Sequence, residues 1–332
     1  MKNKRANVSV IILAVFLAAI MVTGCGKESE GGKTKVRIAY FPNITHTQAL
    51  IMKEQGMLEN KLGEECEVSY TSFNAGPAEV EALMAGEIDM GYIGPVPAIN
   101  ANVKSKGDVQ IIANATNAGA VLIKSIGADI ETAADLDGKT VAIPQLGNTQ
   151  HLGLLNILTK NGLSPKSEGG TVDVVAVANA DVQNLMDQGE IDAALVPEPW
   201  GSILQEKCGA EIVLDYDEVF LDGNYPTAVV VASKDFLQKH PDIVEKFLKA
   251  HEEATLYINE NPVDMAAIVN KQIEEATGKS YDEAIIQSAF SRIQVTKELS
   301  EEAIQEFAKI GVEQGFISKL PDDSLINTEI QK

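Results

Sequence analysis

A short string that occurs twice limits what this chain can fold into. Val80 to Asp89 reads Val-Glu-Ala-Leu-Met-Ala-Gly-Glu-Ile-Asp, and Val182 to Asp192 repeats it with one residue inserted. Each copy has Val, Leu and Met at helical spacing, and then Gly86 or Gly189 where a helix ends, because glycine accepts a positive φ. Each copy follows an Asn-Ala pair and leads into an apolar run. Two such units about a hundred residues apart predict two comparable α/β lobes, and the absence of a shorter period argues against a solenoid.

Strand-like and helix-like segments alternate around both copies. The strand-like runs are 36–41, 67–72, 90–93, 109–113, 120–124, 140–143, 172–177, 193–196 and 228–232, and the helical patterns between them are 45–55, 77–85, 95–104, 149–161, 181–188 and 199–207. This alternation predicts mostly parallel sheets covered by helices on both faces. After residue 233 the pattern is helical, with Pro241 suited to a first turn.

The first 25 residues predict export. Lys2, Lys4 and Arg5 precede an apolar run from 8 to 22, and Val-Thr-Gly-Cys ends at Cys25. A basic start, a short apolar core and small residues before a cleavage point are typical of a secretory signal, and the run is shorter than the roughly 20 residues of a spanning helix. The ending resembles a bacterial lipobox, which implies cleavage after residue 24 and acylation of Cys25. The alternative is an uncleaved anchor in which Cys25 is an ordinary cysteine. Residues 25–33 read as a flexible tether.

Charge limits the possible partners. Without residues 1–24 the chain has 24 basic and 48 acidic residues, a net charge of −24. This charge disfavours nucleic acid and anionic membrane surfaces as partners. Arg5, Arg37 and Arg292 are the only arginines, so an anion site must rely on backbone N–H groups, hydroxyls, amides or lysine. Besides Cys25 there are Cys66 and Cys208, which we expect to stay unpaired. The sequence predicts no metal, no cofactor and no catalytic residues.

Several further motifs follow one another along the chain: Ala39 to Asn43, Leu136 to Lys139 before Gly147-Asn-Thr, Pro197-Glu-Pro-Trp200, and Tyr225-Pro-Thr-Ala-Val before Ser233-Lys-Asp-Phe. Together with the lipobox and the repeated string, and in this order, they resemble the nitrate/sulfonate/taurine-type solute-binding proteins of ABC importers. The likeness runs over residues 34 to 320. It is specific for the family and says little about the ligand.

The resemblance implies a type II periplasmic-binding-protein fold. Lobe I would comprise 34–120 plus 226–332 and lobe II 121–225, joined by a two-strand hinge near 118–124 and 224–229. The lobes would close on a small-molecule ligand and deliver it to a permease and an ATPase. The protein would be an exported monomer held by its lipid on the outer face of the cell membrane.

The ligand should lie beyond the carboxyl ends of the strands, where helix N-termini offer free N–H groups. The candidate residues at these ends are Asn43, Thr45, His46, Asn74, Gly76, Gly94, Pro95, Gly147, Asn148, Thr149, Gln150, His151, Glu198 and Trp200. Tyr225 is a further candidate, because it lies at the proposed hinge and can either reach the ligand or pack in the core. The segment from Gly147 to His151 is the main candidate for an anionic head group, because the matching segment of the family has this role.

Each candidate has an ordinary structural alternative. The asparagines and threonines are also the preferred N-caps of helices, and the two histidines can be buried donors without a ligand. Trp200 can form a stacking wall or pack between helices. Glu198 is the unusual one: in the cleft it would repel a plain anion and attract an amine, which favours a zwitterion such as taurine, but it can equally face solvent.

The sequence therefore predicts a protein that binds a small organic anion or zwitterion, and aliphatic sulfonates and taurine are the favoured ligands. Nitrate, a pyrimidine thiamine precursor, another small heterocycle and an aromatic acid are the alternative ligands. Two functions of other classes stay open. An enzyme of the same fold would need catalytic motifs that the sequence lacks. A ligand sensor for a membrane receptor would have the same sequence features.

Overall fold

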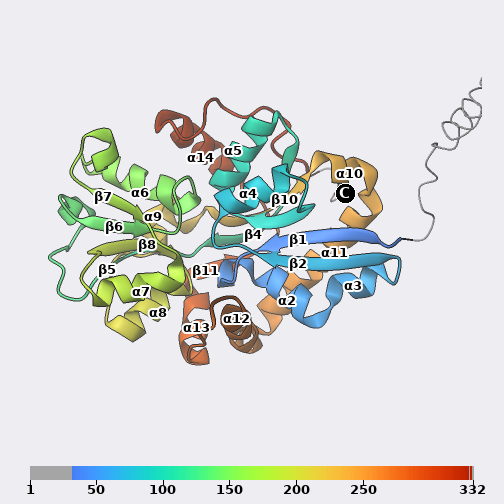
Figure 1. Ribbon diagram of the computed structural model, residues 1–332, viewed down its shortest axis with the longest axis horizontal. Coiled ribbons are helices and arrows are strands. Elements are labelled where there is room, and N and C mark those ends of the chain that lie inside the picture. The colour runs from blue at the N-terminus through green and yellow to red at the C-terminus, as the bar shows by residue number, and fades with distance from the viewer. Residues whose placement is uncertain (1–31, 329, 331–332) are drawn as a thin grey trace, which may run out of the picture. The chain divides into compact units, whose positions relative to one another are not determined.

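Two mixed β-sheets form the framework of the protein. The computed structural model describes residues 32–328 and 330; the signal segment, Cys25 and most of the tether lie outside this part. Within it, the first sheet has the strand order β11-β4-β10-β3-β1-β2 and the second β7-β6-β8-β5-β9 (Figure 1). The strands of the first sheet are β1 (Thr34–Tyr40), β2 (Cys66–Ser72), β3 (Met90–Ile93), β4 (Val109–Ala118), β10 (Pro226–Ser233) and β11 (Ile293–Val295). Those of the second are β5 (Ala120–Lys124), β6 (Thr140–Ile143), β7 (Asp173–Ala176), β8 (Ala193–Pro197) and β9 (Glu211–Leu214).

The two sheets share one strand arrangement. The series β2-β1-β3-β10-β4 in the first corresponds to β7-β6-β8-β5-β9 in the second. In the first, β1 and β3 are parallel and β10 is antiparallel to β3 and β4. In the second, β6 is parallel to β7 and β8, and β5 is antiparallel to β8 and β9. The predicted parallel pairing therefore holds for one side of each sheet; the other side is antiparallel because there the chain passes between the sheets.

The chain leaves the first sheet after β4 and returns to it at β10, and these two passages are hydrogen bonded. The Ala118 N–H donates to the Tyr225 carbonyl at 2.9 Å, and the Thr227 hydroxyl donates to the Ala118 carbonyl. Ala118 and Gly119 both have positive φ, 63° and 85°. A positive φ is costly for alanine. The backbone is thus sharply turned where it enters the second sheet.

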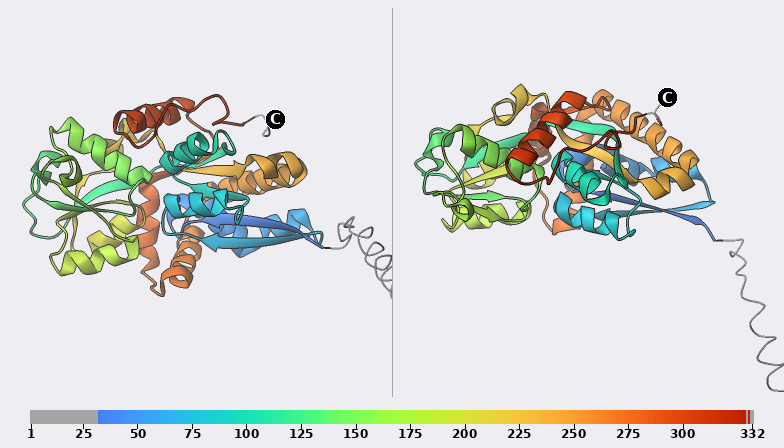
Figure 2. Two further views of the ribbon diagram at one scale, coloured as in Figure 1. Left: turned by 45° about the horizontal axis from the view of Figure 1, so that its top comes forward. Right: turned by 90° about the horizontal axis from the view of Figure 1, so that it is seen from above.

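Helices cover both faces of each sheet, as expected (Figures 1 and 2). Their bounds are α2 (Thr47–Gln55), α3 (Met57–Leu62), α4 (Gly76–Met84), α5 (Pro95–Ser105), α6 (Thr149–Lys160), α7 (Asn179–Asp187), α8 (Trp200–Cys208), α9 (Tyr216–Val219), α10 (Lys234–Lys239), α11 (Pro241–Glu260), α12 (Pro262–Thr277), α13 (Glu283–Ala289) and α14 (Glu301–Glu313). In the C-terminal part, α14 contacts both α5 and α6, and α13 contacts α8, so this region touches helices of both sheets. No helix of the described residues combines the length and the apolar character needed for a membrane crossing.

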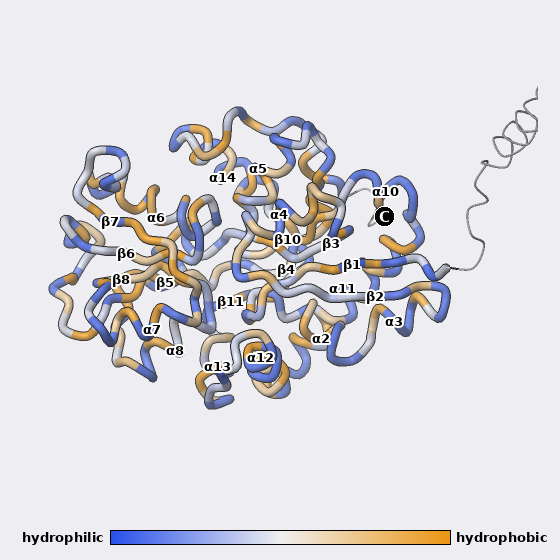
Figure 3. Tube along the Cα trace, in the orientation of Figure 1, coloured by the Kyte–Doolittle hydropathy of each residue, from blue (hydrophilic) through white to orange (hydrophobic). Residues whose placement is uncertain are grey.

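The core follows the apolar strands. β4 and β5 are buried along their whole length, and apolar residues mark the central strands while the outer loops are hydrophilic (Figure 3). All nine predicted strands and six predicted helices before residue 233 are present within a few residues. Two strands were not predicted: β9 is half-buried, and β11 is a three-residue edge strand. Cys66 and Cys208 are free thiols.

The repeated string has the same structure in both halves. Gly86 and Gly189 end α4 and α7 with φ of 72° and 70°. The Asp89 carboxylate accepts the Arg37 N–H at 2.8 Å, and the Asp192 carboxylate accepts the Thr140 N–H at 2.7 Å. In return, the Asp89 N–H donates to the Arg37 carbonyl at 3.0 Å, and the Asp192 N–H donates to the Thr140 carbonyl at 2.9 Å. The repeat therefore fixes the parallel core of each sheet, and with it the position of the strand ends.

Candidate ligand-binding site

A polar cavity lies where strand ends of the two sheets meet. It contains about 360 Å³ of space free of protein atoms, part of it open to solvent. Segments that follow β1, β2 and β3 form one side, and segments that follow β6 and β7 and the last residue of β8 form the other. Thr227 of β10 also lines the cavity. The lining residues are Phe41, Asn43, Thr45, His46, Asn74, Ala75, Gly76, Gly94, Pro97, Pro144, Asn148, Thr149, Gln150, Asn179, Pro197 and Thr227.

Four helices begin at this cavity. The lining includes the first residue or the N-cap of α4, α5, α6 and α7, two from each sheet. The first N–H groups of a helix have no intrahelical partner, and the helix dipole places partial positive charge there. Four such ends around one small volume favour a negatively charged ligand.

The two sides of the cavity contact each other through Thr149. Its hydroxyl accepts the Val96 N–H at 3.4 Å. A Cβ added to Gly94 would lie 2.4 Å from the Thr149 hydroxyl oxygen, so only glycine fits at this approach. The end of β3 and the start of α6 are therefore in direct contact beside the cavity.

The lining carries no charged side chain among the described residues. His46 is its one ionisable group. Its Nδ1 accepts the Phe41 N–H at 3.0 Å, and burial lowers the pKa of His46 to about 3, so the imidazole is neutral at physiological pH. The cavity thus offers dipoles and hydrogen-bonding groups, but no fixed charge.

His151 has the equivalent role in the second half, outside the lining. Its Nδ1 accepts the Gly147 N–H at 3.0 Å, its ring packs against Phe316 with centroids 4.6 Å apart, and burial lowers its pKa to about 4. Both histidines therefore hold a loop in place by accepting a backbone N–H, whereas the structural alternative expected them to be donors.

Two asparagines in the lining, the buried Asn43 and the half-buried Asn179, have a buried amide oxygen without a protein partner in the described part of the chain. Among the described residues, Asn43 Oδ1 and Asn179 Oδ1 have no hydrogen bond. Buried polar atoms are almost always paired in folded proteins, and an asparagine amide offers either its oxygen or its NH₂ group to a neighbour. Asn148 is different, because its Oδ1 caps α6 by accepting the His151 N–H at 2.7 Å. The unpaired amides mark the cavity as a place for a polar ligand.

The structure brings nine of the predicted site residues together in the lining: Asn43, Thr45, His46, Asn74, Gly76, Gly94, Asn148, Thr149 and Gln150. It leaves six outside it: Pro95, Gly147, His151, Glu198, Trp200 and Tyr225. Trp200 is buried and packs edge-on against Tyr281. Tyr225 is buried against Phe307, with its hydroxyl donating to the Tyr216 carbonyl at 3.3 Å.

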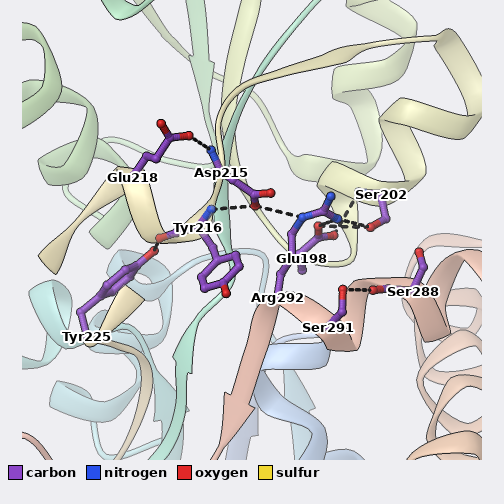
Figure 4. Close-up of polar contacts among 9 residues, drawn as sticks. All are labelled: Glu198, Ser202, Asp215, Tyr216, Glu218, Tyr225, Ser288, Ser291 and Arg292. Carbon is purple, nitrogen blue, oxygen red and sulfur yellow. Dashed lines mark hydrogen bonds and ion pairs between the residues drawn. The ribbon is translucent and has the colours of Figure 1, made fainter. Parts of the chain in front are cut away.

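Glu198 lies neither in the lining nor on the surface. Its carboxylate does not face the cavity: it accepts the Ser202 N–H and hydroxyl at 3.0 and 3.1 Å and pairs with Arg292 Nη1 at 3.0 Å (Figure 4). Burial raises the pKa of Glu198, while the bonds from Ser202 and Arg292 pull it down. The expected attraction of a ligand amine therefore has no support. The sequence could not show this pairing, because Arg292 lies 94 residues further along the chain.

Sequence reasoning missed seven lining residues: Phe41, Ala75, Pro97, Pro144, Asn179, Pro197 and Thr227. Asn179 could have been found, because the repeated string pairs it with Asn74, and both follow equivalent strands. The others contribute backbone or apolar surface, for which single residues give no signal.

Comparison with known proteins identifies the family of this chain. Residues 29–272 match the model of the NMT1-like family. The taurine-binding periplasmic protein of Escherichia coli (strain K12) is 31% identical over an alignment that covers 59% of this chain and 58% of that protein. A putative aliphatic sulfonates-binding protein of Bacillus subtilis (strain 168) is 26% identical over 97% of this chain and 95% of that protein.

A solved structure shows the fold. The alkanesulfonate-binding protein SsuA from Xanthomonas axonopodis pv. citri superposes with a TM-score of 0.73 and 20% identity, covering 89% of this chain and 99% of that one. The expected periplasmic-binding-protein fold is thereby confirmed. With the family model matching most of its length, the chain belongs to the NMT1-like family.

Proposed function

We propose that this protein is the extracytoplasmic solute-binding component of an ABC importer. Its ligand would be a small organic anion, and an aliphatic sulfonate is the favoured candidate. The convergence of four helix N-termini on a cavity without charged side chains is the observation that carries the proposal. The names of its relatives, which refer to taurine and aliphatic sulfonates, support the same class of ligand.

The head group would be held by neutral donors. First-turn N–H groups of α4, α6 and α7, the Thr45 and Thr149 hydroxyls and the amides of Asn43, Asn74 and Asn179 surround the space. α5 contributes only its dipole, because Pro95 and Pro97 have no N–H and the Val96 N–H donates to Thr149. Hydrogen bonds to an ionised acceptor are about twice as strong as neutral ones, and preorganised dipoles lose little entropy on binding. A singly charged head group suits such a site, whereas a doubly charged one would favour guanidinium clamps.

Binding would be coupled to closure of two lobes, 34–120 plus 226–332 and 121–225. The strands of the first sheet fall in the first set and those of the second sheet in the other, and the two passages at Ala118 and Tyr225 lie side by side as a hinge requires. A ligand that contacts both lobes stabilises the closed form by its extra affinity for it. The closed form would then be what the permease and ATPase recognise.

The proposal includes the cellular location of the protein. The lipobox supports acylation of Cys25 and retention of a monomer on the outer face of the cell membrane. Cys25→Ser should move the protein from the membrane fraction to the medium or periplasm; unchanged membrane retention would contradict lipid anchoring.

The binding proposal is tested by calorimetry on the protein without its signal, with ethanesulfonate, nitrate, a pyrimidine and an aromatic acid. We expect ethanesulfonate to bind most tightly. Asn74→Ala should weaken binding by about 10-fold, the usual effect of losing one hydrogen bond to a charged group. Asn60→Ala is the matched control, because Asn60 is exposed on α3. Binding of none of these anions, or equal effects of the two substitutions, would contradict the proposal.

A further inference from the structure

One loop of the cavity is held by a histidine that lies outside the lining. Residues 147–150 join the segment after β6 to the start of α6, and Asn148, Thr149 and Gln150 line the cavity. His151 Nδ1 accepts the Gly147 N–H at 3.0 Å, and the His151 N–H donates to Asn148 Oδ1 at 2.7 Å. The 147–150 loop is therefore closed at both ends on His151, and its form depends on that residue.

The His151 ring can hold this loop only while it is uncharged. Nδ1 accepts the Gly147 N–H through its lone pair, whereas both nitrogens of an imidazolium ring are donors. Burial lowers the pKa of His151 to about 4, so the neutral ring is the main form at physiological pH.

No neighbouring charge accounts for the neutral ring. The elements that pack against α6 are β8, α5, α14 and the 3-10 helix Ala133–Leu136. Within the described part of the chain, the charged side chains of these elements and of α6 itself form no hydrogen bond or ion pair with His151; they are Lys104, Asp135, Lys160, Glu301, Glu302, Glu306, Lys309 and Glu313. The ring is neutral because it is covered.

A side chain of the C-terminal segment provides cover. The ring of Phe316 packs against that of His151, with centroids 4.6 Å apart and planes at 60°. The Phe316 N–H donates to the Gly311 carbonyl at 2.8 Å, which closes the turn after α14. The Gln314 amide donates to the Thr159 hydroxyl of α6 at 3.0 Å. The segment 314–316 is thus attached to α6 at two points.

The first half of the molecule has the same arrangement within one short segment. His46 Nδ1 accepts the Phe41 N–H, and the Phe41 ring itself stacks on His46 with centroids 4.4 Å apart. In the second half the donor is Gly147, which has no side chain, and the ring comes from the distant Phe316. A histidine covered by an aromatic ring therefore holds a loop beside the cavity in each half.

Resting on the proposed function, we propose that Phe316 is a positioning residue for anion binding, which covers His151 and so keeps the 147–150 loop in the form that faces the ligand. Phe316 does not line the cavity and would not touch the ligand. Without its ring, water would reach His151 and the imidazole would be free to turn away from the Gly147 N–H. The loop would then lose part of the preorganisation on which tight binding depends.

The first test is a double-mutant cycle of Phe316→Ala and His151→Ala, with the Kd of ethanesulfonate measured by calorimetry at pH 7.5. We expect Phe316→Ala to raise the Kd about 5-fold, the usual effect of losing one hydrogen bond. In the His151→Ala background the same truncation should change the Kd by less than about 2-fold, because Phe316 acts through the histidine ring. Phe290→Ala is the matched control, since Phe290 is a half-buried phenylalanine of the C-terminal region that packs elsewhere in the core.

The second test needs no ligand. Proton NMR of the His151 ring follows its titration in the wild type and in Phe316→Ala. We expect the truncation to raise the pKa from about 4 towards the ordinary value of 6.5, because water then solvates the charged form. A phenylalanine that only stabilised the fold would leave this pKa unchanged, as Phe290→Ala should. If Phe316→Ala does not fold, Phe316→Val takes its place, with the same direction expected for both measurements.

The outcomes separate this role from the proposed function. If the wild type binds ethanesulfonate, an unchanged Kd in Phe316→Ala, or an equal rise in the His151→Ala background, would overturn the role of Phe316. An unchanged pKa of His151 would show that Phe316 does not cover the ring, which also contradicts the role. If the wild type binds no small anion, the proposed function fails and the role in binding fails with it.

Discussion

The two halves of the molecule share a framework, and the loop after the third strand of that framework differs between them in charge. Both have the same strand order and an aspartate, Asp89 or Asp192, that holds the start of a neighbouring strand. They differ after β3 and β8, where the first half has Gly94 and Pro95 and the second has Pro197 and Glu198. The comparison teaches that the shared framework supplies the helix ends and that a single loop brings in a charge, which a distant arginine must balance.

The largest effect on stability should come from breaking the buried ion pair of Arg292 with Glu198. Arg292→Ala leaves the buried Glu198 carboxylate without its cation, and we expect the free energy of unfolding to fall by about 3 kcal/mol, as for other broken buried pairs. Arg37→Ala is the comparison in the first half. The Arg37 side chain is 35% exposed, so its pair with Asp89 should be worth about 1 kcal/mol. Urea unfolding of both variants measures the difference, and a greater loss in Arg37→Ala would contradict this account of the two loops.

A smaller effect should separate the two repeated aspartates. Asp89→Ala removes bonds to both the backbone and the side chain of Arg37, whereas Asp192→Ala removes the bond to the Thr140 N–H. We expect losses of about 2 and about 1 kcal/mol in the free energy of unfolding. Urea unfolding again provides the measurement. Near-zero change at either position would show that the repeat does not stabilise that sheet.

A third effect, which is absent at neutral pH and grows as the pH falls, concerns the paired histidines. Burial lowers the pKa of His46 to about 3 and of His151 to about 4, below the ordinary value of 6.5. The unfolded chain therefore binds protons that the folded protein does not. The contribution of each histidine to stability is complete above pH 6.5 and is lost as pH falls towards the folded pKa, by up to about 1.4 kcal/mol per pH unit.

Replacing either histidine by glutamine should reduce this pH dependence by a similar amount, because both halves use the ring in the same way. Unfolding free energies at pH 6 and pH 5 measure it. His240→Gln is the control, since His240 lies at the end of α10, away from both loops. If one of the two substitutions left the pH dependence unchanged, the equivalence of the two loops would be wrong.

The fold could be predicted further than the site. Periodicity and the repeated string predicted nine strands and the change to helices after residue 233, because these patterns are local. Strand ends then located residues such as Asn74 and Thr149 at the cavity, since parallel strands bring their carboxyl ends to one edge. The pairing of Glu198 with Arg292 has no local signal, because it depends on how the C-terminal segment packs against the second sheet. For the same reason the sequence could not show that Trp200 and Tyr225 are buried against Tyr281 and Phe307 and do not line the polar cavity.

The account depends on an anion being held in the cavity by helix N-termini of both sheets. A crystal structure with 2-bromoethanesulfonate tests this most directly, because the anomalous signals of bromine and sulfur locate both ends of the ligand. We expect the sulfonate beside Asn43, Thr149 and Asn179, within hydrogen-bonding distance of first-turn N–H groups from helices of both sheets. A ligand bound elsewhere, or a sulfonate that meets groups of one sheet alone, would contradict it.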